Sequence, residues 1–429
     1  MKQVLLISSV VYFFMINEGC SKSSGSGFDG NVIAYAPVSV TKQVTSKKVF
    51  AHILPWFETP ASNGGYWGEH WIMTNQNPNT FTNAGDSQRN IASNYYPMIG
   101  PYASGDTNVI DYQLLLMKLS GIDGIFIDWY GTSTDAGQAN YSQVLANTLA
   151  LKSRVGQAGL KYAIVYEDQA LSNYDSANTI KWGQADMEYM QSNFFNDPNY
   201  ETINGEPLLL NFGPQHIETG TEWSTVFSVL SPIIPQFYTL SGHSDLATGV
   251  ADGEFAWVQS NGISDLDYFY NNDNGYTGSK MSAGFAGYNS FYIAGGETCS
   301  GCTWVITPTV SEFQQTIDLA LQQTNNNYIQ LVTWNDYGEG TMIEPTDLTY
   351  NRAGYSPVPG FGYSLLTTLQ QELGVQSSLS QSSLEMVNKL YTARVANASN
   401  AANLAKLDQV YYDLVSLRLS DAQSLLAGF

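Results

Sequence analysis

Two carboxylates near residue 336 have the spacing for acid–base chemistry. Asp336 and Glu339 stand three residues apart in the stretch 328–345, which reads YIQLVTWNDYGEGTMIEP. Two acids can hold different protonation states at one pH when each lies in the field of the other and burial disfavours their charges. The neighbouring rings of Trp334 and Tyr337 could supply that burial. The alternative is a solvated turn after a strand, and the spacing alone does not decide between the two.

The acids follow a segment that has the composition of a buried strand. Residues 328–334 are apolar and β-branched with no polar face, which is typical of a strand covered on both sides in a parallel sheet. Similar runs occur at 49–55, 122–129, 161–167, 207–212, 233–238, 254–258 and 291–294. Helix-like segments separate them, at 109–120, 138–158, 177–195, 222–230, 264–270 and 310–323. Eight strands that alternate with helices predict an α/β protein of the (β/α)8 TIM-barrel type over residues 48–375.

In such a barrel the functional side chains gather at the carboxyl ends of the strands. Besides the two acids, the predicted strand ends carry carboxylates, amides and aromatic rings: Trp56, Asp128, Trp129, Tyr130, Glu167, Asn211, Tyr238, Trp257 and Asn335. Each alone has a structural alternative, such as a helix cap for Asp128, a core ring for Trp56 or an ion pair for Glu167. Because these types recur at one edge of separate strands, we expect them to form one substrate-binding site.

Composition narrows the class of partner. The 429 residues include 38 acidic and 17 basic ones, and the resulting net charge of −21 would repel nucleic acid. The chain holds 28 Tyr, 19 Phe and 9 Trp residues. Aromatic rings stack on sugar faces, so this content favours a polysaccharide or oligosaccharide as partner. We expect a monomer.

The amino terminus resembles the signal of a bacterial lipoprotein. One lysine precedes an apolar run over residues 4–16, which is shorter than the roughly 20 residues of a membrane span and typical of a signal peptide. We expect residues 1–19 to be removed, Cys20 to be lipidated and residues 20–47 to form a tether. The protein would then be exported and anchored by lipid to a bacterial membrane, at the cell surface or in the periplasm. The alternative is a secreted protein with an incidental cysteine.

The other two cysteines, Cys299 and Cys302, form a C-x-x-C motif. A redox motif would open a helix after a strand, and no such pattern follows here. A zinc site would need two more ligands, and the four histidines are scattered. In an oxidising compartment a local disulfide is the favoured interpretation. We expect no metal and no cofactor.

The carboxyl-terminal part, residues 376–429, differs from the barrel. A Ser/Gln-rich break at 376–383 precedes apolar residues at helical spacing over 384–395 and 404–419. These segments predict a two-helix appendage that packs on the barrel as a brace, with an interaction surface as the alternative.

Several motifs of the chain resemble glycoside hydrolase families 71 and 99. They are FAHILPWFETP, GYWGEHW, YYPMIGPYASGD, GIDGIFIDWYG and WNDYGEGTMIEP. The resemblance covers residues 48–374. These barrel enzymes include endo-acting α-mannosidases in family 99 and α-1,3-glucanases in family 71. EGTMIEP is similar to family 99, which has Glu where this chain has Asp336. WNDYGE is similar to family 71, which has Ser in place of Gly340.

The resemblance implies roles for the two acids. Glu339 would protonate the leaving glycosidic oxygen and Asp336 would act as the base, in an endo-acting hydrolase of an α-linked polysaccharide of the α-mannan or α-1,3-glucan type. Asp is shorter than Glu by one carbon–carbon bond, about 1.5 Å. The wider gap favours a separation of roughly 6.5–9.5 Å with room for water, and thus inversion.

The resemblance also implies roles for other residues. Glu167 and Asp128 would hold sugar hydroxyls, while the rings of Trp56, Trp129, Tyr130 and Trp257 would stack on sugar faces. The alternative function is a non-hydrolytic glycan-binding lipoprotein of the cell surface on the same barrel. The presence of both acids favours the hydrolase.

Overall fold

The computed structural model of the chain describes residues 28, 30–83, 87–132, 140–173, 178–272, 278–299, 301–352 and 355–429. The expected signal peptide and Cys20 lie outside these residues, so lipid anchoring stays a prediction. No helix in the described ranges has both the length and the apolar character needed to cross a bilayer.

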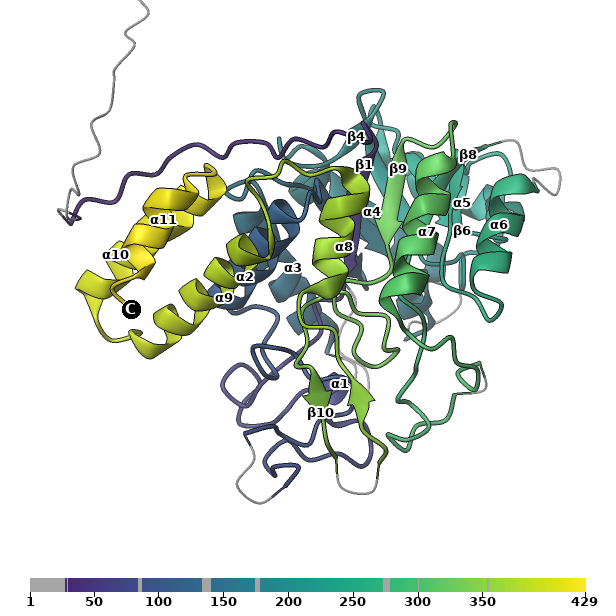
Figure 1. The fold of residues 1–429 in the computed structure, drawn as a ribbon. Coiled ribbons are helices and arrows are strands. Elements are labelled where there is room, and N and C mark those ends of the chain that lie inside the picture. The colour runs from purple at the N-terminus through teal and green to yellow at the C-terminus, as the bar shows by residue number, and fades with distance from the viewer. Residues whose placement is uncertain are drawn as a thin grey trace, which may run out of the picture.

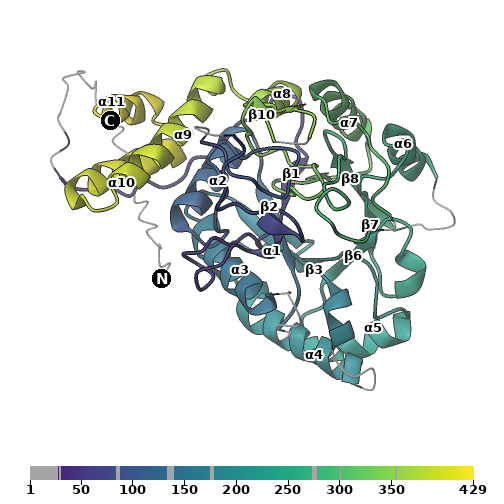
Figure 2. The same ribbon diagram turned by 90° about the horizontal axis from the view of Figure 1, so that it is seen from below.

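Eight parallel strands close into a ring at the centre of the molecule, which confirms the predicted barrel (Figure 2). Its strands are β1 (Lys48–Ile53), β2 (Gly124–Trp129), β3 (Lys161–Tyr166), β5 (Glu206–Asn211), β6 (Gln236–Leu240), β7 (Gly253–Phe255), β8 (Ser279–Gly284) and β9 (Tyr328–Leu331). Parallel pairing of β1 with β9 and of β3 with β5 completes the ring. The short strand β4 (Thr202–Ile203) pairs antiparallel with β5 and lies outside it.

Helices cover the outside of the ring (Figure 2). They are α2 (Thr107–Leu119), α3 (Tyr141–Val155), α4 (Thr179–Met190), α5 (Gly220–Phe227), α6 (Ile263–Asn271), α7 (Val310–Gln322) and α8 (Ser364–Leu373). The connection from β6 to β7 carries only the 3-10 turn Ser244–Ala247. Strand side chains alternate between the helix layer and the barrel interior, and both sets are buried, which explains the near-continuous apolar runs of the sequence.

The seventh strand differs from its predicted place. It is β8, Ser279–Gly284, and not residues 291–294, which form a turn in the loop between β8 and α7. The sequence SKMSAG has one large apolar residue and thus no strand pattern. Small residues let α7 approach, because a Cβ on Gly284 would lie 2.3 Å from Cδ1 of Ile317 in α7.

Two long connections lie together at the carboxyl end of the barrel. One follows β1 and holds the short helix α1 (Glu69–Ile72); the other follows β9 and holds the hairpin β10 (Thr349–Tyr350) and β11 (Val358–Pro359). Figure 1 shows α1 and β10 at this end of the molecule. A second hydrophobic cluster, which includes Phe57, Trp71, Tyr95, Tyr337 and Met342, joins the two connections. The loops above the strands therefore have a core of their own.

The carboxyl-terminal appendage contains three helices and not the expected two: α9 (Gln381–Ala396), α10 (Ala401–Val415) and α11 (Leu419–Leu426). The sequence pattern predicts one continuous helix over 404–419. In the structure Leu417 has a φ of +59°, which ends the helix there. There the N–H of Arg418 bonds back to the carbonyl of Asp413, and α11 begins. α9 lies along α2 of the barrel (Figure 1).

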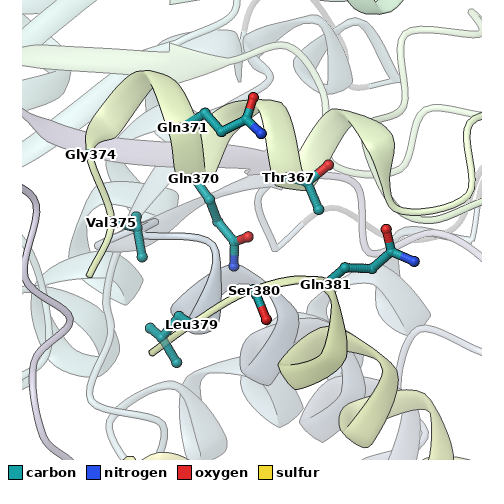
Figure 3. A pocket seen from close by; sticks show the side chains of 8 residues that line it. All are labelled: Thr367, Gln370, Gln371, Gly374, Val375, Leu379, Ser380 and Gln381. Atoms are coloured by element: carbon teal, nitrogen blue, oxygen red, sulfur yellow. The ribbon is translucent and has the colours of Figure 1, made fainter. Parts of the chain in front are cut away.

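A cavity of about 420 Å³ lies between α8 and the start of α9 (Figure 3). It is lined by amide, hydroxyl and aliphatic groups of Thr367, Gln370, Gln371, Gly374, Val375, Leu379, Ser380 and Gln381. No carboxylate or aromatic ring is among them, so this cavity lacks the groups for acid–base chemistry.

Candidate active site

The loop after β9 folds Asp336 and Glu339 into one tight turn. The N–H of Glu339 donates to Oδ1 of Asp336 at 2.7 Å, and the N–H of Asp336 donates to the Thr333 hydroxyl at 2.8 Å. Gly340 follows with a φ of +67°, and a Cβ there would lie 2.6 Å from the carbonyl oxygen of Asn289. The loop therefore needs glycine at 340, and the two acids are held in place by the backbone.

Burial shifts the titration of both acids. It raises the pKa of Asp336 to about 7, although backbone N–H groups of Glu339 and Gly338 stabilise the charged form and counter part of the rise. Burial also raises the pKa of Glu339 well above its usual value, and the charge of Asp336 raises it further. Asp336 thus ionises while Glu339 keeps its proton, which is the division of labour of a base and an acid.

Acids from two other strands join this pair. Asp128 ends β2 with 1% of its surface exposed, and Glu167 follows β3 with 5% exposed. Burial raises the pKa of Glu167 well above its usual value, and the charge of Asp128 adds to the rise. The same charge also raises the pKa of Asp336. Within the described residues, no lysine or arginine forms an ion pair with any of these four acids.

His52 lies beside Asp128, and it was not among the site residues predicted from the sequence. It is buried on β1, with Nε2 3.7 Å from Oδ1 of Asp128 and its ring edge-on to Trp257 at 4.9 Å. The carboxylate of Asp128 is buried and also interacts with the side chains of Tyr130 and Glu167. A lone polar residue next to the end of an apolar strand is the pattern that could have identified His52.

Two tyrosines of the loop between β8 and α7 also approach the acids. Burial raises the pKa of Tyr292 well above its usual value, and the charges of Asp336 and Glu339 raise it further. Burial also raises the pKa of Tyr288, and the same two charges add to the rise. Its ring stacks on that of Trp304 with centroids 3.9 Å apart. Neither tyrosine is in the predicted site, because the apolar pattern predicts a strand at 291–294, where the structure has the loop that reaches the acids.

Three of the predicted aromatic residues lie at this end of the barrel and are half-buried. Trp56 stacks on His70 with centroids 3.8 Å apart, and burial lowers the pKa of His70 to about 3. Tyr130 stacks on Tyr141 at 5.1 Å. Its pKa is raised by burial first and then by the charges of Asp128 and Glu167, so the ring lies close to the acids. Trp257 contacts His52, as described above.

Two predicted aromatic residues lie elsewhere, which corrects their expected role. Trp129 is fully buried and packs on Tyr189 and Phe194 in the helix layer, because strand side chains alternate and Asp128 already faces inward. Tyr238 lies in the middle of β6, against Gly253 at the start of β7. The strand runs two residues further than predicted, so Tyr238 does not reach the carboxyl end.

The two predicted amides are used by the protein itself. Asn211 donates to the carbonyl of Tyr166 and to Oδ1 of Asp168, and so holds the ends of β3 and β5 together. Asn335 accepts from the N–H of Leu54 and donates to its carbonyl and to the Tyr102 hydroxyl. Both amides therefore hold neighbouring segments together, and their contact with a sugar stays a prediction. Away from the acids, Cys299 and Cys302 form a disulfide.

Comparison with known proteins agrees with this architecture. No family model matches the chain. Glycoprotein endo-alpha-1,2-mannosidase of Mus musculus is 22% identical over 324 residues, 67% of this chain and 66% of that protein. The protein of the same name from Rattus norvegicus is 21% identical over 332 residues, 69% of this chain and 67% of that one. The match thus spans just under two thirds of the mouse protein.

Solved structures show the same fold. A GH99 endo-alpha-mannosidase from Bacteroides thetaiotaomicron superposes with a TM-score of 0.57 at 17% identity, covering 77% of this chain and 99% of that one. A glycoside hydrolase-like protein gives 0.54 at 13% identity, covering 79% and 97%. The chain is therefore a (β/α)8-barrel protein with a cluster of acids at the carboxyl end of its strands. It is similar to the family 99 endo-α-mannosidases, which confirms that part of the predicted resemblance.

Proposed function

We propose that the chain is a glycoside hydrolase that cleaves α-mannan-type glycans, with Glu339 as general acid and Asp336 as general base. The carrying observation is the pair of carboxyls on one tight turn, Asp336 buried and Glu339 partly buried, whose pKa values are both raised by desolvation. The mannan class is supported by the relatives, which are named endo-alpha-1,2-mannosidases.

The geometry gives each acid a step. Glu339, whose raised pKa favours the protonated form, donates its proton to the glycosidic oxygen as the bond to the anomeric carbon breaks. Asp336, with a pKa of about 7, is ionised in part of the molecules and takes a proton from the attacking water molecule. Proton transfer of this kind contributes roughly 10²–10⁴-fold to the rate.

The surrounding residues favour a positively charged transition state. Glycosidic cleavage passes through an oxocarbenium-like state. The charge of Asp128 makes this end of the barrel negative, and no lysine or arginine of the described residues forms an ion pair with it. Fixed charge of opposite sign in a buried site stabilises the developing positive charge. The buried carboxylate of Asp128, beside His52, Tyr130 and Glu167, is also an acceptor for sugar hydroxyls.

The stereochemical course follows from side-chain length. The base is Asp336 and not a glutamate, so its carboxylate starts closer to the backbone by about 1.5 Å. We propose that a water molecule fills the gap and that the anomeric configuration is inverted. Endo-type cleavage of a polymer is part of the same proposal.

The test is the release of reducing ends from a panel of α-mannans and α-1,3-glucans by the purified protein. We expect release from α-mannan, and its loss in the double variant Asp336→Asn/Glu339→Gln. Release from α-1,3-glucan alone would replace the mannan class by the glucan class. Binding of glycans without any release would overturn the hydrolase and support the glycan-binding alternative.

A further inference from the structure

Glu344 closes the loop that carries the acids, and the mechanism above gives it no role. It is 1% exposed and accepts three hydrogen bonds. The Tyr102 hydroxyl donates to Oε2 at 2.8 Å and the Tyr337 hydroxyl to the same oxygen at 3.0 Å. The Gln113 amide of α2 donates to Oε1 at 2.9 Å. One carboxylate therefore joins the loop after β1, a barrel helix and the acid-bearing loop.

The hydrogen bonds of Glu344 connect it with both residues next to Asp336, directly with Tyr337 and through Tyr102 with Asn335. Tyr337 follows Asp336 in the chain and donates to Glu344 directly. Asn335 precedes Asp336 and donates to the Tyr102 hydroxyl at 3.1 Å, while its amide also bonds to both backbone groups of Leu54. The backbone on either side of Asp336 is thus fixed through Glu344 and through the end of β1.

We propose that Glu344 is a positioning residue, which holds Asp336 at its working distance from Glu339 and from the sugar through Tyr102 and Tyr337. This inference rests on the proposed hydrolase function. Glu344 touches neither acid itself in any hydrogen bond of the described residues, so its effect passes through the loop backbone.

Removal of Glu344 would be costly because its hydrogen-bond donors are buried. A carboxylate buried without a cation is costly unless its oxygens are hydrogen-bonded. The three donors satisfy Glu344, and without it two tyrosine hydroxyls and one amide would lose their acceptor in a buried place. Misplacement of a reacting group by about 1 Å can cost on the order of 10²-fold in rate.

The experiment compares Glu344→Ala and Glu344→Gln with a matched control, Glu201→Ala. Glu201 is equally buried, at 2% exposure, and accepts from Lys48 and from the Tyr328 hydroxyl, which belong to β1 and β9 at the opposite end of the barrel. We expect Glu344→Ala to lower kcat on α-mannan on the order of 10²-fold, with KM and glycan Kd unchanged within about threefold.

The other two variants separate positioning from stability. The oxygen of glutamine can accept from both tyrosines while Gln113 turns its amide, so Glu344→Gln should keep kcat within about fivefold of the wild type. Glu201→Ala should lose stability and keep kcat. A kcat of Glu344→Ala within threefold of the wild type, or an equal kcat loss in Glu201→Ala, would overturn the proposal. If Glu344→Ala does not fold, Tyr337→Phe and Tyr102→Phe take its place, and unchanged kcat in both would overturn it.

A second readout needs no substrate. Carboxyl ¹³C NMR follows the titration of Asp336, assigned by its loss in Asp336→Asn. We expect the titration to move in Glu344→Ala and to stay in place in Glu201→Ala; an unmoved titration in Glu344→Ala contradicts the positioning role. If the wild type cleaves no glycan, the hydrolase proposal fails, and the NMR titration still decides whether Glu344 positions Asp336.

Discussion

Burial is the main cause of every raised carboxyl pKa at the carboxyl end of this barrel. It is the largest cause for Asp336, Glu339, Glu167 and Glu344, and repulsion between the acids adds to the rise for Asp336, Glu339 and Glu167. Such carboxyls keep their protons at higher pH than exposed carboxyls do. A cationic partner would have the opposite effect, because it lowers a carboxyl pKa.

This titration makes the stability depend on pH in a defined direction. Burial raises the pKa of Glu344 from 4.5 to about 7. The folded state then binds more protons than the unfolded state between these values, so the free energy of unfolding falls as pH rises through this range. At about 1.4 kcal/mol per pH unit, Glu344 alone contributes about 3 kcal/mol to the fall.

Urea unfolding at pH 5, 6, 7 and 8 measures this contribution. We expect wild-type stability to fall across the series, and the fall to be smaller by about 2–3 kcal/mol in Glu344→Gln, which cannot titrate. The same pH dependence in both proteins would show that Glu344 does not titrate in this range.

Among the elements, the contact between the barrel and its appendage depends on a buried charge. Asp111 of α2 is 2% exposed and bonds to Arg154 of α3, with Nε to Oδ1 at 2.8 Å. Arg394 of α9 donates to its other oxygen at 2.7 Å and also reaches Asp408 of α10 at 2.8 Å. Both guanidinium groups lie over the ring of Tyr411 of α10. Asp111 and its two arginines therefore connect α2, α3, α9 and α10, which is consistent with a structural role for the appendage.

Removal of the carboxylate and of one arginine should have unequal effects. Asp111→Ala leaves two arginines without their buried partner and should cost about 3–5 kcal/mol of unfolding free energy. Arg394→Leu leaves Asp111 paired with Arg154 and should cost less, about 1–2 kcal/mol. Asp408→Ala, at an exposed partner, is the control and should cost less than about 1 kcal/mol. Urea unfolding ranks the three, and a larger loss in Arg394→Leu than in Asp111→Ala would contradict the arrangement.

At the scale of the whole molecule, the alternation of apolar runs and helices predicted the barrel, because both faces of a barrel strand are buried. It failed at β8, where close packing of α7 selects small residues and removes the apolar pattern. Because the strand was predicted at 291–294, the loop after β8 was not expected at the site, and Tyr288 and Tyr292 were not among the predicted residues. The third appendage helix was missed because Leu417 adopts a positive φ that its residue type does not announce.

Whether a residue near a strand end belongs to the site depends on the direction in which its side chain points. Asp128, Glu167, Asp336 and Glu339 meet as expected, since strand ends converge in a barrel whatever the loops do. Trp129 follows an inward residue and so points outward, which the two-residue period could have shown. Asn211 and Asn335 bind backbone groups of neighbouring segments, and such partners depend on tertiary contacts that no local pattern contains.

The central claim is that Glu339 donates a proton and Asp336 accepts one, and the kinetics of Glu339→Gln and Asp336→Asn test it most directly. Each variant is assayed on α-mannan and on an aryl α-mannoside whose leaving group needs no protonation, with Glu201→Gln as control. On the polymer both variants should lose kcat by roughly 10²–10⁴-fold or more. On the aryl mannoside Glu339→Gln should be largely rescued while Asp336→Asn is not, because the attacking oxygen must still lose its proton. Near-normal turnover of the polymer by either variant would contradict the assignment.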